Sequence, residues 1–246
     1  MKGYPMERIL AKLDEYTHKN DYAAAERHLL YWLEEKRGTP VALTLYNELL
    51  GIYRKTAQEE KALSTVKNAL QNVENLGLSD TVTAATTYLN AATVLHAFSR
   101  ADEGLPLFEK AKGIYERELS PSDTRLGGLY NNMGTALVTL GRFADADLLY
   151  KKAISIMQAA EDGDLEVAVT LLNMASAVEA EKGTLDGEEE ISSLLGEART
   201  LLEKQERRDG YYAFVASKCA PVYRYFGHFR YAKELEERSE RIYEGA

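Results

Sequence analysis

Residues 129–156 read LYNNMGTALVTLGRFADADLLYKKAISI, and this stretch predicts the fold of the chain. Apolar residues recur every three or four positions on both sides of Gly141, which predicts two amphipathic helices joined by a tight turn. Gly134 and Ala146 are small enough for the two helices to pack closely. The residues equivalent to Ala146 stand at positions 25, 62, 104, 191 and 232. The pattern therefore repeats about every 40 residues.

Six helix-turn-helix repeats account for nearly the whole chain. Their approximate limits are 5–38, 41–76, 81–119, 124–160, 165–206 and 210–244. A single helix pair cannot bury its apolar stripe alone, so neighbouring pairs must stack. We therefore expect one all-α domain over residues 1–246, a solenoid of about six repeats.

The repeat at 129–156 resembles a tetratricopeptide repeat. The matching small, apolar and aromatic residues are Gly134, Leu137, Gly141, Phe143, Ala146, Tyr150 and Ala153. The long period and the asparagine-rich first helices are similar to those of kinesin light chains. The resemblance implies a right-handed α-α superhelix whose first helices line a concave groove that holds a peptide.

Composition and charge exclude several other classes of protein. With 45% hydrophobic residues, 17 Gly and 5 Pro, the chain has the apolar content of a folded protein. Its formal charge of −9 repels nucleic-acid phosphates. The apolar runs are far shorter than a membrane span, and residues 1–8 lack the apolar core of a signal peptide. With one cysteine, no internal disulfide can form, and we expect a cytoplasmic protein without nucleic-acid or membrane partners.

No pattern of catalytic or metal-ligating residues stands out. The four histidines are scattered, and Cys219 falls on the packing stripe of its helix, where a buried thiol is expected. The segment 162–166 (DGDLE) weakly resembles part of a calcium loop, but a helix start explains it equally well. We predict no enzyme, no metal and no cofactor.

Three places depart from the regular pattern. In the fifth repeat, residues 183–190 (GTLDGEEE) delay the second helix by four positions. This segment is either a protruding acidic loop or a longer turn whose glutamates favour the start of the next helix. Pro106 is expected to delay or bend the second helix of repeat three, and Pro221 to kink the first helix of repeat six.

Asparagines occupy the side of the first helices that lies opposite the packing stripe. Asn90, Asn132 and Asn173 share one helical position, and Asn47 and Asn131 precede that position by one residue. A carboxamide both donates and accepts, so a row of them could pair with the main chain of an extended peptide. Alternatively, they hydrogen-bond between neighbouring first helices or face water.

Basic and aromatic residues on the same side complete the candidate site. They are Arg54, Lys218, Arg224, Phe214 and Tyr225. The two rings with their cations could form an anchor pocket for a partner, or the rings could close the end of the solenoid. Acidic residues such as Glu48 and Glu179 share this side, so the sequence predicts no preference for the charge of a partner. The Lys and Asn pattern of a carboxylate clamp is absent.

The sequence thus predicts a non-catalytic scaffold that binds a protein or peptide in its groove, as a monomer or weak homodimer. Two alternatives stay open. One is a regulatory sensor of a short signalling peptide, and the other is a structural solenoid that self-associates through its ends.

Overall fold

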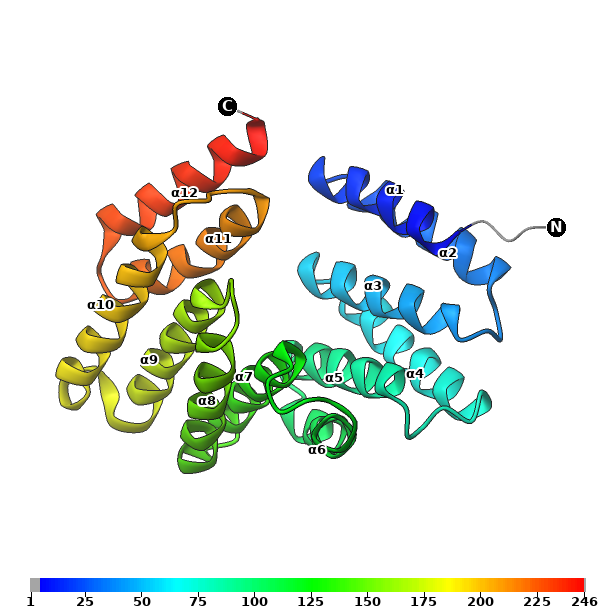
Figure 1. Ribbon diagram of the computed structural model, residues 1–246, viewed down its shortest axis with the longest axis horizontal. Helices are drawn as coiled ribbons and strands as arrows, with labels where there is room; N and C mark the ends of the chain where they lie inside the picture. Colours follow the sequence, from blue (N-terminus) through cyan, green and yellow to red (C-terminus); the bar gives the residue numbers. More distant parts are fainter. Residues whose placement is uncertain (1–4, 246) are drawn as a thin grey trace. The chain divides into compact units, whose positions relative to one another are not determined.

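The computed structural model describes residues 5–245, which form twelve α-helices and no strands (Figure 1). The first four residues of the segment considered for a leader lie outside this range. The helices group into two compact units, residues 1–119 and 120–246. That the chain forms one continuous domain stays a prediction.

Unit 1 consists of three helix pairs. The helices are α1 (Met6–His18), α2 (Tyr22–Glu35), α3 (Val41–Lys55), α4 (Glu59–Asn75), α5 (Val82–Ala97) and α6 (Ala101–Glu118). Each odd-numbered helix packs on the next one, and α3 also contacts α5. Ile9, Leu29 and Leu50, from three successive helices, are fully buried in the core of this unit.

Unit 2 repeats the same plan. Its helices are α7 (Thr124–Thr139), α8 (Phe143–Gln158), α9 (Asp164–Asp186), α10 (Glu188–Lys204), α11 (Gly210–Tyr225) and α12 (Phe229–Glu244). The pairs are α7 with α8, α9 with α10, and α11 with α12, while α9 also contacts α7 and α11. The all-α architecture of stacked helix pairs is therefore confirmed.

The helix pairs turn at equivalent positions. Asn20, Ala57, Ser99, Gly141 and Gly227 each have a positive φ, between 53° and 83°. Glycine adopts this left-handed conformation at no steric cost, and asparagine tolerates it better than most residues. The turn predicted at Gly141 is confirmed, and Asn20 and Gly227 form the same turn in other pairs. Ala57 and Ser99 form it without a residue that favours a positive φ.

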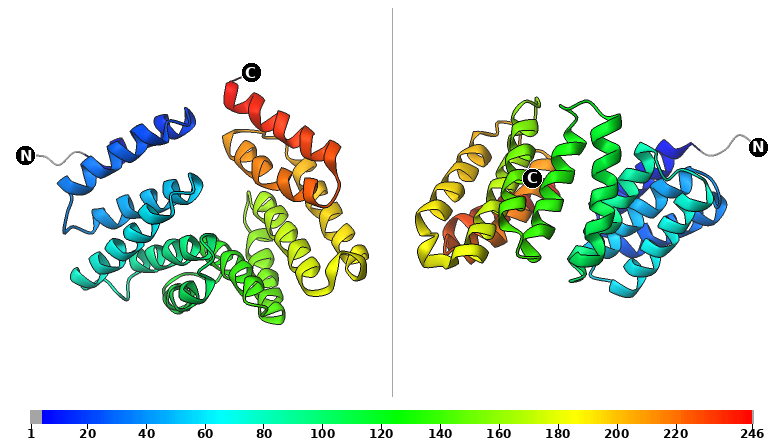
Figure 2. Two further views of the ribbon diagram at one scale, coloured as in Figure 1. Left: turned by 180° about the vertical axis from the view of Figure 1, so that it is seen from behind. Right: turned by 90° about the horizontal axis from the view of Figure 1, so that it is seen from below.

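The fifth pair differs from the others. Gly183 has φ 78° and ψ 166°, which interrupts the helical geometry of α9 near its end. One further turn leads to Asp186, and α10 begins at Glu188 beside α9 (Figure 2). The segment is thus a longer, largely helical turn rather than a protruding loop. Glu188, Glu189 and Glu190 lie in the first turn of α10, as a helix start favours.

Both prolines lie inside helices that continue past them, and a bend at either one stays a prediction. α6 begins at Ala101, so Pro106 in its interior does not delay it. α11 continues as one helix from Gly210 to Tyr225 with Pro221 inside. The weak calcium-loop resemblance at residues 162–166 corresponds to the turn before α9, which begins at Asp164.

Small residues on the facing sides of the paired helices set the packing. A Cβ added to Gly134 would lie 2.8 Å from Cε1 of the buried Tyr150, and one added to Gly104 would lie 2.9 Å from the carbonyl oxygen of Ala92. Ala146 is fully buried. The apolar side of α7, which includes Met133 and Leu137, is buried as well.

Candidate peptide-binding face

Two of the predicted asparagines bond to each other. Nδ2 of Asn173 on α9 donates to Oδ1 of Asn131 on α7 over 2.9 Å. Both side chains are half-buried, as is the neighbouring Asn132. The structure therefore shows the hydrogen bond between first helices that the sequence left open as an alternative for this pair. Each carboxamide still has further hydrogen-bonding capacity, because it carries two donor hydrogens and two acceptor lone pairs.

Three other predicted residues belong to unit 1. Asn90 is half-buried on α5, and Arg54 lies exposed in the last turn of α3. Oδ1 of Asn47 is buried on α3 and has no hydrogen-bond partner among the residues described. Because Asn90 and Asn132 lie in different units, a row through Asn90, Asn132 and Asn173 stays a prediction.

The exposed side of α11 carries a continuous row of side chains. We call this row the α11 stripe; it consists of Tyr211, Phe214, Lys218, Pro221 and Tyr225, all exposed. Their spacing of three or four residues places them on one side of the helix. The exposed fractions of the three aromatic residues range from 41% for Phe214 to 68% for Tyr225. Such large exposed rings on one side of a helix are typical of binding surfaces.

Carboxylates of α9 hold both ends of the α11 stripe. The hydroxyl of Tyr211 donates to Oε1 of Glu166, and the hydroxyl of Tyr225 donates to Oε1 of Glu179 over 3.1 Å. The bond to Glu179 raises the pKa of Tyr225. Burial and the bond to Glu166 raise the pKa of Tyr211. Both tyrosines therefore stay protonated and keep donating at neutral pH.

The two predicted cations of α11, Lys218 and Arg224, contact different parts of unit 2. Nζ of Lys218 lies 5.6 Å from the centroid of the Phe214 ring, a cation–π distance. Arg224 forms an ion pair of 2.5 Å with Glu236 on α12 and so is engaged away from the rings. Of the two predicted cations, Lys218 thus lies beside a ring and Arg224 contacts α12, and the anchor pocket stays a prediction.

Tyr211 and Glu166 belong to this face but are not among the predicted site residues. Two signals could have indicated them. Tyr211 extends the spacing of Phe214 and Lys218 by one helical step, and Glu166 precedes Tyr211 by 45 residues, about one repeat. Residues one repeat apart are neighbours on adjacent first helices.

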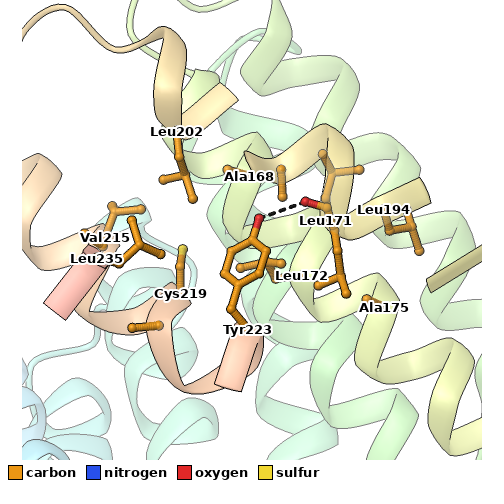
Figure 3. Close-up of a cluster of buried hydrophobic side chains, with 14 of the residues drawn as sticks. Ala168, Leu171, Leu172, Ala175, Leu194, Leu202, Val215, Cys219, Tyr223 and Leu235 are labelled. Atoms are coloured by element: carbon orange, nitrogen blue, oxygen red, sulfur yellow. Dashed lines mark hydrogen bonds between the residues drawn. The ribbon is translucent and has the colours of Figure 1, made fainter. Parts of the chain in front are cut away.

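The opposite side of α11 is part of the core. Cys219 is 1% exposed, as predicted, and burial raises the pKa of its thiol to about 12. Figure 3 shows Cys219 and Tyr223 among Leu172, Leu194 and other apolar side chains. A protonated, buried thiol is not available as a nucleophile.

Within residues 5–245, no group of three His, Cys, Asp or Glu side chains is placed to hold a metal ion. No helix in the described part of the chain is long and apolar enough to cross a membrane.

Comparison with known proteins assigns the third and fourth helix pairs to a family. Residues 83–159 match the family model of the tetratricopeptide repeat. These residues are tetratricopeptide repeats. The match covers the third and fourth repeats, which include the stretch that predicted the fold, and it confirms the resemblance to tetratricopeptide repeats.

Solved structures of tetratricopeptide repeat proteins share the fold over most of the chain. BtubC (BKLC) from P. vanneervenii is 19% identical, with a TM-score of 0.67 and 82% of each chain covered. The nearly identical TPR-like repeats of a putative kinesin light chain from Podosopora anserina are 18% identical, with a TM-score of 0.57, covering 82% of this chain and 95% of that one. A Rap protein complexed with Competence and Sporulation Factor is 16% identical, with a TM-score of 0.51, covering 97% of this chain and 73% of that one. At these identities the likeness concerns the fold alone. A search of curated protein sequences gives no match.

Proposed function

We propose that this tetratricopeptide repeat protein is a non-catalytic scaffold that binds an extended segment of a partner protein. The segment lies on the exposed side of α7, α9 and α11 in unit 2. The observation that carries the proposal is the α11 stripe, in which Tyr211, Phe214 and Tyr225 expose 41–68% of their surface on one side of a helix. Aromatic rings bury much area at little entropic cost when a partner covers them, which is why they dominate binding surfaces.

The amides of α7 and α9 support an extended conformation of the bound segment. Asn131 and Asn173 are fixed by their mutual hydrogen bond and keep spare donors and acceptors, and Asn132 lies beside them. A peptide main chain offers alternating N–H and C=O groups, which carboxamides pair with regardless of the partner's sequence. The amides would hold the main chain while the α11 stripe contacts side chains.

Two measurements test the alternatives that the sequence left open: the oligomeric state of the protein and the size of the partner it binds. A solenoid that self-associates through its ends gives a mass in light scattering that rises beyond that of a dimer as the concentration increases. The proposed scaffold, with a chain of 27.5 kDa, stays a monomer or weak homodimer. A sensor of a signalling peptide binds a free short peptide rather than a segment of a larger protein.

The test begins with capture of partners by the full chain from lysate, followed by mass spectrometry and synthesis of the bound segment. Calorimetry then compares wild-type protein with Asn132→Ala, which we expect to weaken binding by about 1–3 kcal/mol through loss of a hydrogen bond to a buried group. The matched control is Gln158→Ala, which removes an exposed carboxamide at the end of α8.

The thermal midpoint of unfolding is expected to be the same for both variants. A triple variant with Asn131, Asn132 and Asn173 all changed to Ala that binds as tightly as wild type would show that the amides do not hold the partner. Unaltered binding by Phe214→Ala would refute the proposed face itself.

A further inference from the structure

Glu179 is half-buried beside Tyr225, at the C-terminal end of the α11 stripe, and has no ion pair among the residues described. Its only described side-chain contact is the hydroxyl of Tyr225, which donates over 3.1 Å. A carboxylate has about four acceptor positions, and one hydroxyl fills one of them. Within residues 5–245, neither Glu179 nor Glu166 forms an ion pair.

The nearest basic residues in the sequence are engaged elsewhere. Lys182, one turn after Glu179 on α9, pairs with Glu190 of α10 over 2.7 Å. Arg224, next to Tyr225, pairs with Glu236 of α12. Both cations are thus drawn toward second helices and away from the face formed by α9 and α11. Neither of these two cations therefore pairs with Glu179.

The wider charge of unit 2 has the same sign. Residues 120–246 contain 15 Lys and Arg against 22 Asp and Glu, a formal charge of −7 out of the −9 of the whole chain. Excess charge of one sign attracts a partner of the opposite sign and speeds its association.

The ring of Tyr225 adds a second reason to expect a cation. It is 68% exposed and its plane is held at 83° to that of Phe226, with 5.1 Å between the ring centroids. A guanidinium or ammonium group over such a ring gains cation–π attraction, and the same group reaches an adjacent carboxylate. Ring and carboxylate are already joined by a hydrogen bond, so both are positioned before a ligand arrives.

From this geometry we infer that the bound segment is basic, with a Lys or Arg side chain seated on the Tyr225–Glu179 pair. The inference rests on the proposed function and specifies the chemistry of its partner. Glu166 is the weaker seat, because it lies in the first turn of α9, where the helix N-terminus already stabilises a negative charge. The two ends of the α11 stripe therefore differ, and the cation binds at its C-terminal end.

The test uses the full chain and three pools of fluorescent twelve-residue peptides. All pools vary randomly among Leu, Tyr, Gly and Ser, and one central position is fixed as Arg, Gln or Glu. Fluorescence anisotropy measures the affinity of each pool at low salt. We expect the Arg pool to bind about tenfold tighter than the Gln pool, and the Glu pool to bind most weakly. Added NaCl should reduce the difference, because Tyr225 leaves one side of the seat open to solvent.

Variants locate the effect at the proposed seat. Glu179→Gln should lower the affinity for the Arg pool about tenfold and leave the Gln pool unchanged. The matched control is Glu181→Gln, which makes the same change of charge two residues later, about 160° around α9. Tyr225→Leu should also lower the affinity for the Arg pool. Its control is Phe229→Leu, which changes an exposed ring on α12. Circular dichroism checks that each variant is folded.

The outcomes separate the two claims. If wild type binds all three pools with equal affinity and Phe214→Ala lowers the affinity for each of them, the proposed function holds and the preference for a cation is wrong. If Glu181→Gln weakens the Arg pool as much as Glu179→Gln does, the charge acts at long range and no seat exists. If no pool binds wild type more tightly than it binds Phe214→Ala, the proposed function fails and the inference fails with it.

Discussion

The two sides of α11 use the same residue types for different purposes. On the buried side, Tyr212 and Tyr223 are at most 1% exposed, and the hydroxyl of Tyr223 donates to the carbonyl oxygen of Leu195 over 2.8 Å (Figure 3). On the exposed side, Tyr211 and Tyr225 are 45% and 68% exposed, and their hydroxyls donate to carboxylates. Position around the helix, rather than residue type, decides whether a ring stabilises the fold or is available to a partner.

The largest effect on stability is expected from Tyr223→Ala. The substitution removes a ring that the core of unit 2 encloses, together with its hydrogen bond to Leu195. Loss of a large buried aromatic side chain should lower the free energy of unfolding by about 3–5 kcal/mol. Urea denaturation followed by circular dichroism measures the change. Phe229→Ala serves as the control, since that ring is 67% exposed, and an equal loss in the two variants would contradict the comparison.

Cys219 provides a chemical test of the same buried side. Its pKa is raised to about 12, first by burial and then by the charge of Glu166, so the native thiol stays protonated at pH 8. We expect a disulfide reagent to label it at least about a hundredfold more slowly in native protein than in denaturant. Because an unfolded thiol ionises near pH 8.5, this group should lower stability progressively as the pH rises from there toward 12. Rapid native labelling at pH 8 would show that α11 opens readily.

The sequence predicts the helix pairs well because their signals are local. Periodic apolar residues and turn residues such as Gly141 and Gly227 mark each hairpin. The turns at Ala57 and Ser99 cannot be predicted in this way, because these residues do not favour a positive φ on their own and adopt it where two packed helices are joined. The extra turn after Gly183 is indicated by spacing alone, which cannot distinguish a loop from a helical turn.

The candidate site is predicted less completely because its contacts join different repeats. A carboxamide such as Asn131 can bond a neighbouring helix or a ligand with equal chemistry, so the sequence does not specify its 2.9 Å contact with Asn173. Arg224 has the charge expected of a binding residue, yet its long side chain forms an ion pair with Glu236 on α12. The pairing of Tyr211 with Glu166 depends on how adjacent first helices align, which no local pattern specifies.

Two glycines of α7 test the comparison on another helix. Gly134 faces the second helix, where a Cβ would lie 2.8 Å from Tyr150, whereas a Cβ on Gly128 would have no atom within 4 Å. Gly134→Ala should therefore destabilise the protein by about 1–3 kcal/mol through overpacking. Gly128→Ala should stabilise it by about 0.5–1 kcal/mol, because alanine favours a helix. Thermal denaturation shows whether each variant is more or less stable than wild type. A change in the same direction for both variants would contradict the assignment of the two sides of α7.

The smallest effect on stability is expected from Phe214→Ala in the α11 stripe. Phe214 is 41% exposed and contacts Tyr211 and Lys218 of its own helix, so its removal leaves the core of unit 2 intact. The free energy of unfolding should change by no more than about 0.5 kcal/mol, while affinity for the partner segment falls. A clear drop in the melting temperature with unchanged affinity would instead mean that the ring closes the end of the repeats. The two explanations predict opposite results for stability and affinity. A ring that covers the core stabilises the protein even when no partner is bound, whereas a ring that only contacts a partner contributes to affinity and not to stability.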